Sequence, residues 1–245
     1  MPKYYGWGLP FDASVHGHVI DNLIYIVHVF MALLFVGWLI FFITALIKFR
    51  ARPGHKAIHH PPHSKVSSYL EIGVAIFEVV LLIGFSIPIF GAYRDKLPSK
   101  EEALEIRVIA EQFAWNIHYP GTDKVFGKSK PELMGPGNPI GLDPNDLNGK
   151  DDIVAINQLH VPVGKPVIAR LSSKDVIHAF YLPVMRVKQD TIPGHEIPVW
   201  FEAAKTGKFE IACAQLCGLG HYRMRGFFFI DTPEQFDTWI KGFKK

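Results

Sequence analysis

Cysteine is nearly absent from this chain. Only Cys213 and Cys217 occur among its 245 residues, which is too few, and too close together, for the disulfide framework of a small secreted domain. The sequence also lacks a Cys-x-x-Cys-His segment, the attachment site of a covalent c-type haem. These absences exclude a disulfide-stapled mini-domain and a c-type cytochrome.

Charged residues are missing from one long stretch and nearly missing from a second. Residues 22–47 contain no Asp, Glu, Lys or Arg, and residues 72–93 contain only Glu78. A membrane-spanning helix needs about 20 apolar residues, so we expect two spans, the second kinked by Pro88 near its outer end. The first apolar run is longer than a signal-peptide core and no small-residue cleavage site follows it, so a cleaved signal is not expected.

Acidic residues are also missing from residues 48–70, the loop between these spans, which is instead basic: Lys48, Arg50, Arg52, Lys56 and Lys65. Under the positive-inside rule this loop is cytoplasmic. Both termini and the C-terminal part then face outward, into the oxidising periplasm if the cell is Gram-negative. The same loop holds four histidines, interpreted as a solvated cluster rather than a metal site: His55, His59, His60 and His63.

The remainder of the chain has the pattern of a β-rich domain. Short runs of strand-forming residues, separated by turn residues, occupy residues 106–117, 153–161, 166–171, 198–203, 208–212 and 226–230. Residues 121–151 are rich in Gly, Pro, Asn and Asp and predict a long loop, and residues 233–243 predict a helix that begins after a Thr232 cap. We therefore predict an α+β protein, with a two-helix transmembrane hairpin over residues 1–100 and a β-sandwich or barrel over residues 101–245.

The richest set of metal-binding side chains lies in Cys213-Ala-Gln-Leu-Cys217-Gly-Leu-Gly-His221-Tyr-Arg-Met224. Soft sulfur ligands combined with imidazole favour copper over harder ions. Three alternatives remain open on spacing alone. They are a Cys213–Cys217 disulfide, a zinc site, and a mononuclear copper site that would leave one cysteine unused.

This segment closely resembles the binuclear copper signature of subunit II of haem–copper cytochrome c oxidases, Cys-x-x-x-Cys-x-x-x-His-x-x-Met. Upstream, Ser173-Lys-Asp175-Val-Ile-His178 and Val187-Lys-Gln-Asp190-Thr-Ile-Pro193-Gly194 also look like the family's, and the likeness covers nearly the whole chain. The resemblance implies a cupredoxin-like domain that binds two copper ions. It implies bridging by Cys213 and Cys217, one copper on each of His178 and His221, and weak ligation by Met224 and by the backbone carbonyl of Gln215.

Two departures from the family pattern affect other roles. Gln215 replaces the usual Glu, whose side chain helps to bind magnesium in the family, and a neutral amide is a poorer magnesium ligand than a carboxylate. Phe113, in Gln112-Phe-Ala-Trp115, replaces the tryptophan near the donor docking surface, and Phe113 and Trp115 are the candidates for electron uptake.

Glu71 matches the family's acidic residue at the mouth of a proton channel. Glu78 is an ionisable residue inside a span and a second proton-uptake candidate.

The resemblance implies the electron-accepting subunit of a proton-pumping terminal oxidase in a bacterial inner membrane. Cytochrome c or a membrane complex would supply electrons, and a haem-bearing subunit I would reduce oxygen to water. The chain alone would not reduce oxygen, and no nucleic-acid partner is expected. Alternatives are a membrane-tethered copper carrier and the copper subunit of a nitric-oxide-reducing relative. Asp175 and Asp190 are interpreted as solvated surface charge.

Overall fold

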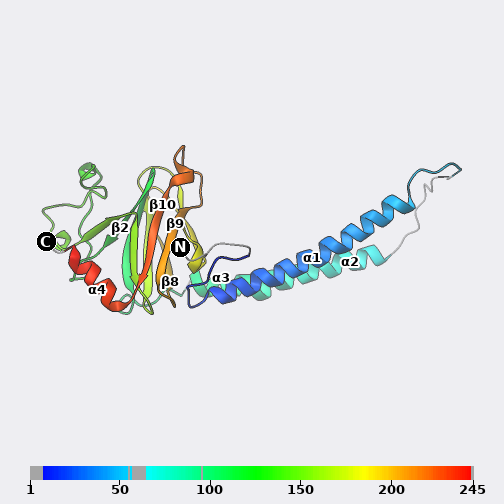
Figure 1. The fold of residues 1–245 in the computed structure, drawn as a ribbon, viewed down its shortest axis with the longest axis horizontal. Coiled ribbons are helices and arrows are strands. Elements are labelled where there is room, and N and C mark those ends of the chain that lie inside the picture. The colour runs from blue at the N-terminus through cyan, green and yellow to red at the C-terminus, as the bar shows by residue number, and fades with distance from the viewer. Residues whose placement is uncertain (1–7, 55, 57–64, 95, 244–245) are drawn as a thin grey trace. The chain divides into compact units, whose positions relative to one another are not determined.

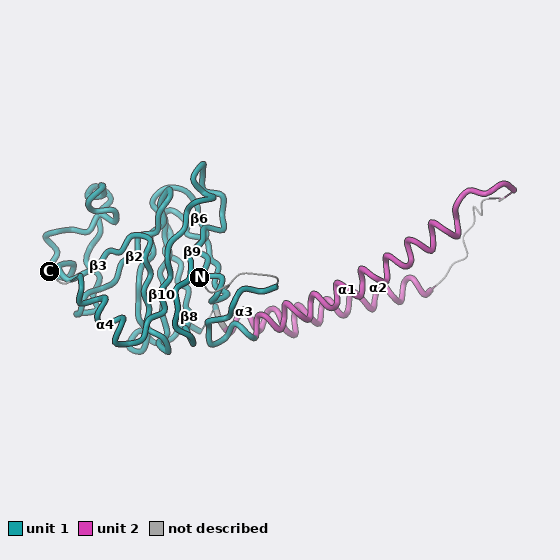
Figure 2. Tube along the Cα trace, in the orientation of Figure 1, with its two compact units in different colours: residues 1–18, 93–245 teal, residues 19–92 magenta. Residues whose placement is uncertain are grey.

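A computed structural model describes residues 8–54, 56, 65–94 and 96–243. The chain divides into two compact units, one formed by residues 1–18 with 93–245 and the other by residues 19–92 (Figure 2). The first unit contains all of the β-strands and the second is helical.

The helical unit contains the two predicted spans. Its elements are α1 (Gly17–Lys48), α2 (Lys65–Leu81), the π-helix η1 (Leu82–Ser86) and α3 (Ile87–Arg94). Gly17–Lys48 and Lys65–Ala92 are long and apolar enough to cross a membrane by length and composition, and none of their most apolar residues is buried. Side chains that cover no protein core are what a lipid-facing helix requires.

A π-helical turn interrupts the second span just before Pro88. Proline has no amide hydrogen, so the carbonyl of residue 84 loses its usual helical partner. The chain widens to η1 immediately before this point, and the Ser86 hydroxyl donates to the Leu81 carbonyl at 3.2 Å. The irregularity expected from Pro88 is therefore a π-turn that ends at Ser86, two residues before the proline.

The β-domain is a sandwich of two five-stranded sheets (Figure 1). The first sheet has the order β3-β2-β1-β5-β8 and the second the order β4-β10-β9-β6-β7. The strands are β1 (Leu104–Glu111), β2 (Ala114–Tyr119), β3 (Ile153–Ile156), β4 (Gln158–Pro162), β5 (Pro166–Ser173), β6 (His178–Leu182), β7 (Val187–Thr191), β8 (Ile197–Glu202), β9 (Gly207–Cys213) and β10 (Arg225–Asp231). Most pairs are antiparallel, but β1 with β5 and β4 with β10 are parallel.

One hydrophobic core fills the space between the sheets. Its largest fully buried side chains include Trp115, Phe180, Phe201 and Phe228. Buried and partly exposed residues alternate along β1 and β10, because successive strand residues point to opposite faces of a sheet. This packed core gives the strand ends near the metal motif a rigid support.

Strand boundaries differ from the prediction in three places. The predicted run 106–117 is a hairpin, since β1 and β2 pair antiparallel around a turn at Gln112 and Phe113. The run 153–161 divides into β3 and β4 at Asn157, which has a φ of 56°. The prediction missed β6 and β7 entirely. The missing strands matter because β6 carries His178.

The N-terminal strap, residues 10–16, packs on the β-domain before α1 begins. The Ala13 amide donates to the Val184 carbonyl at 2.9 Å, and the Ala13 carbonyl accepts from the Ala204 amide at 2.7 Å. Ala13 is fully buried, and the ring of Phe11 stacks on that of Phe209 with centroids 6.2 Å apart. The strap therefore completes one end of the sandwich.

The predicted C-terminal helix is α4 (Pro233–Gly242). Thr232 and Gln235 form a capping box at its start, which satisfies two backbone amides that would otherwise lack partners. Trp239 stacks on His160 with ring centroids 4.1 Å apart and contacts Tyr119 edge-on at 5.2 Å. These aromatic contacts hold α4 against β2 and β4.

Candidate metal centre

The metal motif occupies the connection between two adjacent strands. Cys213 is the last residue of β9, and Met224 immediately precedes β10. Because β9 and β10 are antiparallel neighbours, the connection must fold back on itself within eleven residues, and a single turn of 3-10 helix at His221–Arg223 helps it to do so. The register of β6 against β9 pairs Phe180 with Cys213. This pairing brings His178, at the start of β6, to the same edge.

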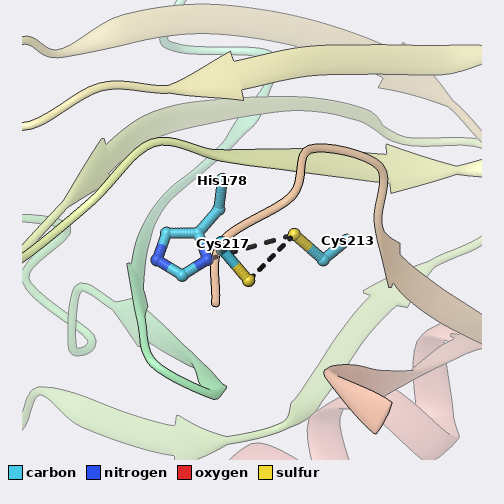
Figure 3. A group of neighbouring side chains, drawn as sticks. All are labelled: His178, Cys213 and Cys217. Carbon is cyan, nitrogen blue, oxygen red and sulfur yellow. Dashed lines mark hydrogen bonds between the residues drawn. The ribbon is translucent and has the colours of Figure 1, made fainter. Parts of the chain in front are cut away.

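Three donor atoms meet at this edge, although His178 is far from the cysteines in sequence. The ligand atoms of His178, Cys213 and Cys217 all lie within 4.8 Å of one another, and Figure 3 shows the imidazole ring and the two sulfur atoms facing a common point. The two sulfur atoms are 3.8 Å apart, so the thiols are not joined in a disulfide, whose sulfur atoms would be roughly 2.05 Å apart.

The remaining predicted donors lie around the same point. Met224 Sδ is 3.2 Å from His178 Nδ1 and 3.7 Å from Cys217 Sγ. On the other side, His221 Nδ1 is 3.6 Å from Cys217 Sγ, and the Gln215 carbonyl is 3.2 Å from Cys213 Sγ. The structure thus brings together every residue proposed as a ligand from the sequence.

The two thiols lie in different electrostatic environments. Burial opposes ionisation of Cys213, but contacts with His178 and the Ala179 and Gln215 backbone outweigh burial and lower its pKa to about 6. Cys217 is 3% exposed, and burial together with the neighbouring Cys213 charge raises its pKa to about 11. A bound cation would remove this inequality, because it favours ionisation of both thiols.

His178 is held by a carboxylate on the side away from the sulfur atoms. Its Nε2 atom lies 2.9 Å from Asp175 Oδ1, which leaves Nδ1 facing Met224 and Cys213. Burial would raise the pKa of the Asp175 carboxyl, but hydrogen bonds from His178 and from the Gln112 and Val176 amides outweigh burial and lower it. Asp175 is solvent-exposed, as interpreted from the sequence, but its carboxylate also orients His178, a role that this interpretation missed. Its spacing three residues before His178 was the available signal.

The two aromatic candidates for electron uptake occupy different depths. Trp115 is fully buried, and its ring meets those of His178 and Phe180 edge-on at 6.2 and 5.5 Å. Phe113 is partly buried and lies on the motif itself, because a Cβ placed at Gly220 would be 2.4 Å from Phe113 Cδ2. Phe113 thus packs on the loop, and Trp115 packs against His178 in the core.

Both proton-uptake candidates lie in α2 of the helical unit. Glu71 accepts a hydrogen bond from the Ser67 hydroxyl at 3.0 Å, and Glu78 is exposed on the same helix. The histidines of the loop between the spans, His55, His59, His60 and His63, lie outside the described residues.

The donor set fits copper. Two thiolates, two imidazoles, a thioether and a carbonyl combine soft and borderline ligands, which copper prefers and which magnesium and calcium do not. The sulfur separation of 3.8 Å is short enough for both thiolates to share a metal. A structural zinc site would leave Met224, only 3% exposed and directed at the centre, without a role.

The family model for the periplasmic domain of cytochrome c oxidase subunit II matches residues 104–227, about half of the chain. A curated relative, the alternative cytochrome c oxidase subunit 2 of Bradyrhizobium diazoefficiens, is 31% identical over 223 residues, which cover 91% of this chain and 79% of the relative.

The chain belongs to the cytochrome c oxidase subunit II family. Cytochrome c oxidase subunit 2 of Alkalihalophilus pseudofirmus is 29% identical, and the match covers 91% of this chain but only 58% of that longer relative. A solved structure of the periplasmic domain of subunit II of cytochrome oxidase from Bradyrhizobium japonicum is 34% identical, with a TM-score of 0.45, and covers 61% of this chain and 97% of that one.

The match confirms the family that the sequence motifs resemble. It also confirms the predicted α+β fold, with two apolar helices and a cupredoxin-like domain. Copper binding and electron transport fit this family, and the group of His178, Cys213 and Cys217 is able to bind a metal. The subunit II chain is thus an electron-transfer component of a terminal oxidase.

Proposed function

We propose that this subunit II binds two copper ions and is the electron-accepting subunit of a respiratory terminal oxidase. Convergence of His178, Cys213, Cys217 and Met224 at one end of the sandwich supports this proposal most strongly. When bound, two copper ions in such a site would supply one-electron transfer chemistry. Cys213 and Cys217 would be shared by both ions, and His178, His221, Met224 and the Gln215 carbonyl would complete the ligand set.

The protein's own contribution is rigidity. β6 and β9 fix His178 and Cys213 through their hydrogen-bonded register, and Trp115 and Phe180 pack beside them in the core. A scaffold that does not move between redox states keeps the reorganisation cost low. Trp115, buried against His178, and Phe113, on the loop, are the proposed residues for electron uptake from cytochrome c or a membrane complex.

Metal content and paramagnetic spectroscopy of the full chain test the copper proposal. We expect two copper ions per chain and a hyperfine pattern of one electron shared by two copper nuclei. Cys217→Ser and His221→Ala should each abolish this pattern, since each removes a ligand. His195→Ala, at an exposed histidine of the same domain, serves as the control and should change nothing. Full retention of the pattern in Cys217→Ser would contradict the proposal.

We propose further that electrons pass to haem groups in a subunit I, which reduces oxygen to water and translocates protons. Glu71 and Glu78 are the proposed proton-uptake residues. Glu71 matches the family's acidic residue at the mouth of a proton channel, and Glu78 lies inside a span, where ionisable residues are costly and usually mark a functional site. A membrane-tethered copper carrier is the competing function. Co-purification of the chain with a haem-bearing subunit would support the oxidase role, and isolation alone with readily exchanged copper would support the carrier.

A further inference from the structure

Gln112 lies in the turn between β1 and β2, and its side chain reaches the metal motif. Its Nε2 atom donates a hydrogen bond to the Cys217 carbonyl at 2.6 Å, across 105 residues of sequence. The contact is close enough to exclude a side chain from the next position, because a Cβ at Gly218 would lie 2.6 Å from this nitrogen. The turn therefore contacts the backbone of Cys217 and Gly218 directly.

The backbone of the same residue reaches the other ligand-bearing segment. The Gln112 amide donates to Asp175 Oδ2 at 2.7 Å, while the second oxygen of this carboxylate faces His178 Nε2 at 2.9 Å. One residue thus connects Cys217 with the group that orients His178. The partners of metal-binding histidines commonly set ring orientation and influence metal affinity.

We propose that Gln112 is a positioning residue of the metal centre, which holds the Cys213–Met224 loop in register with His178 through these two hydrogen bonds. The inference rests on the proposed copper function and deepens it. The register of β6 against β9 holds the Cys213 end of the loop beside His178, so loss of the amide contact frees the Cys217 side of the loop while the β6–β9 pairing remains. Gln112 itself supplies no donor to the metal.

Two substitutions separate this role from simple packing. Gln112→Glu keeps the size of the side chain and the backbone amide, but it replaces the donating nitrogen with an oxygen that repels the Cys217 carbonyl. Gln112→Ala removes the contact altogether. The matched control is Gln158→Glu, at an exposed glutamine that begins β4, a strand without proposed ligands.

The first measurement uses the metal-free full chain. Cys217 is almost fully buried, and we expect both Gln112 variants to increase its alkylation by iodoacetamide about tenfold, with little change at Cys213. The second measurement uses the copper-loaded full chain. A chelator should remove copper about 10 to 100 times faster from the variants, and the hyperfine pattern should change, whereas the melting temperature should match that of Gln158→Glu.

The outcomes distinguish this inference from the proposed function. Alkylation and copper-release rates equal to those of Gln158→Glu would overturn the positioning role. A fall in melting temperature that accounts for both rates would also overturn it, because it would show a general structural role. If the unmodified chain binds no copper while Cys217 still becomes reactive in the variants, the proposed function fails, but the role of Gln112 in positioning the loop stands.

Discussion

Gly220 lies under the ring of Phe113, and a side chain at this position has no room. Its φ of −92° suits any residue, so the close approach of Phe113, and not backbone strain, requires glycine. Gly218 differs, because its φ of 132° disfavours a side chain independently of its neighbours. These two glycines let the loop fold tightly beneath the β1–β2 turn.

Gly220→Ala should therefore displace Phe113 and loosen the metal loop. We expect a loss of about 1–3 kcal/mol in the free energy of unfolding, the usual cost of overpacking, together with weaker copper retention. Denaturant unfolding and copper analysis measure the two effects. Gly137→Ala is the control, since nothing lies within 4 Å of its Cβ position. Addition of Phe113→Ala should relieve part of the cost, and simple additivity of the two changes would contradict the contact.

The thiol pair of the metal-free chain should react unequally with iodoacetamide. The pKa of Cys213 is lowered to about 6, so its thiolate fraction, and with it the alkylation rate, should rise as pH increases through about 6. Cys217, with a pKa raised to about 11, should stay slow at neutral pH. Mass spectrometry after timed quenching measures both rates. Equal rates at pH 7 would contradict the assignment.

At the scale of elements, the N-terminal strap belongs to the β-domain although it precedes the first span in the sequence. A fragment that begins at residue 102 lacks the strap and leaves the backbone groups of Val184 and Ala204 without their Ala13 partners. The Glu202 carbonyl also loses its bond from the Val15 amide, and three lost backbone hydrogen bonds with the exposed contact surface of Phe209 amount to about 3 kcal/mol. We expect the fragment to melt roughly 10 °C lower than the same fragment with residues 8–16 restored by fusion.

Substitution at Ala13 tests the same contact in the full chain. Ala13→Leu forces extra atoms into a fully buried position, whereas Val15→Leu changes a side chain that is 47% exposed. Circular dichroism during heating should show a lower melting temperature for the first variant and no change for the second. Equal melting temperatures would mean that the strap does not stabilise the domain.

The elements and the site were predictable from sequence to different degrees. The spans follow from composition alone, and five proposed donors lie within twelve residues, where spacing is informative. His178 is 35 residues from Cys213, and only the family resemblance connected them. The strands β6 and β7 escaped prediction because β6 is short and is followed directly by Pro183, and β7 exposes Lys188 on a polar face. The β1–β2 turn was missed because Gln112 and Phe113 are not typical turn residues. Therefore its contacts with Cys217 and Asp175 were missed too.

At the scale of the whole molecule, orientation in the membrane follows from the uneven placement of charge. The loop formed by residues 48–70 carries five basic residues and no acidic one, which predicts a cytoplasmic loop and a β-domain on the outer side. A protease added to cells with a permeable outer envelope should digest the β-domain and spare the loop. Antibodies against tags in each region, followed by immunoblotting, would detect this. Digestion of the loop alone would show the opposite topology, with the loop outside and the β-domain in the cytoplasm.

The separation of 3.8 Å between the two sulfur atoms also has a consequence for biogenesis. Thiols this close need only a small movement to oxidise to a disulfide, and the thiolate of Cys213 is the form that begins such reactions. On the outer side of the membrane, where the basic loop predicts the β-domain to lie, oxidation of the metal-free thiols would therefore compete with metal loading. A metal held by both sulfur atoms would block this oxidation.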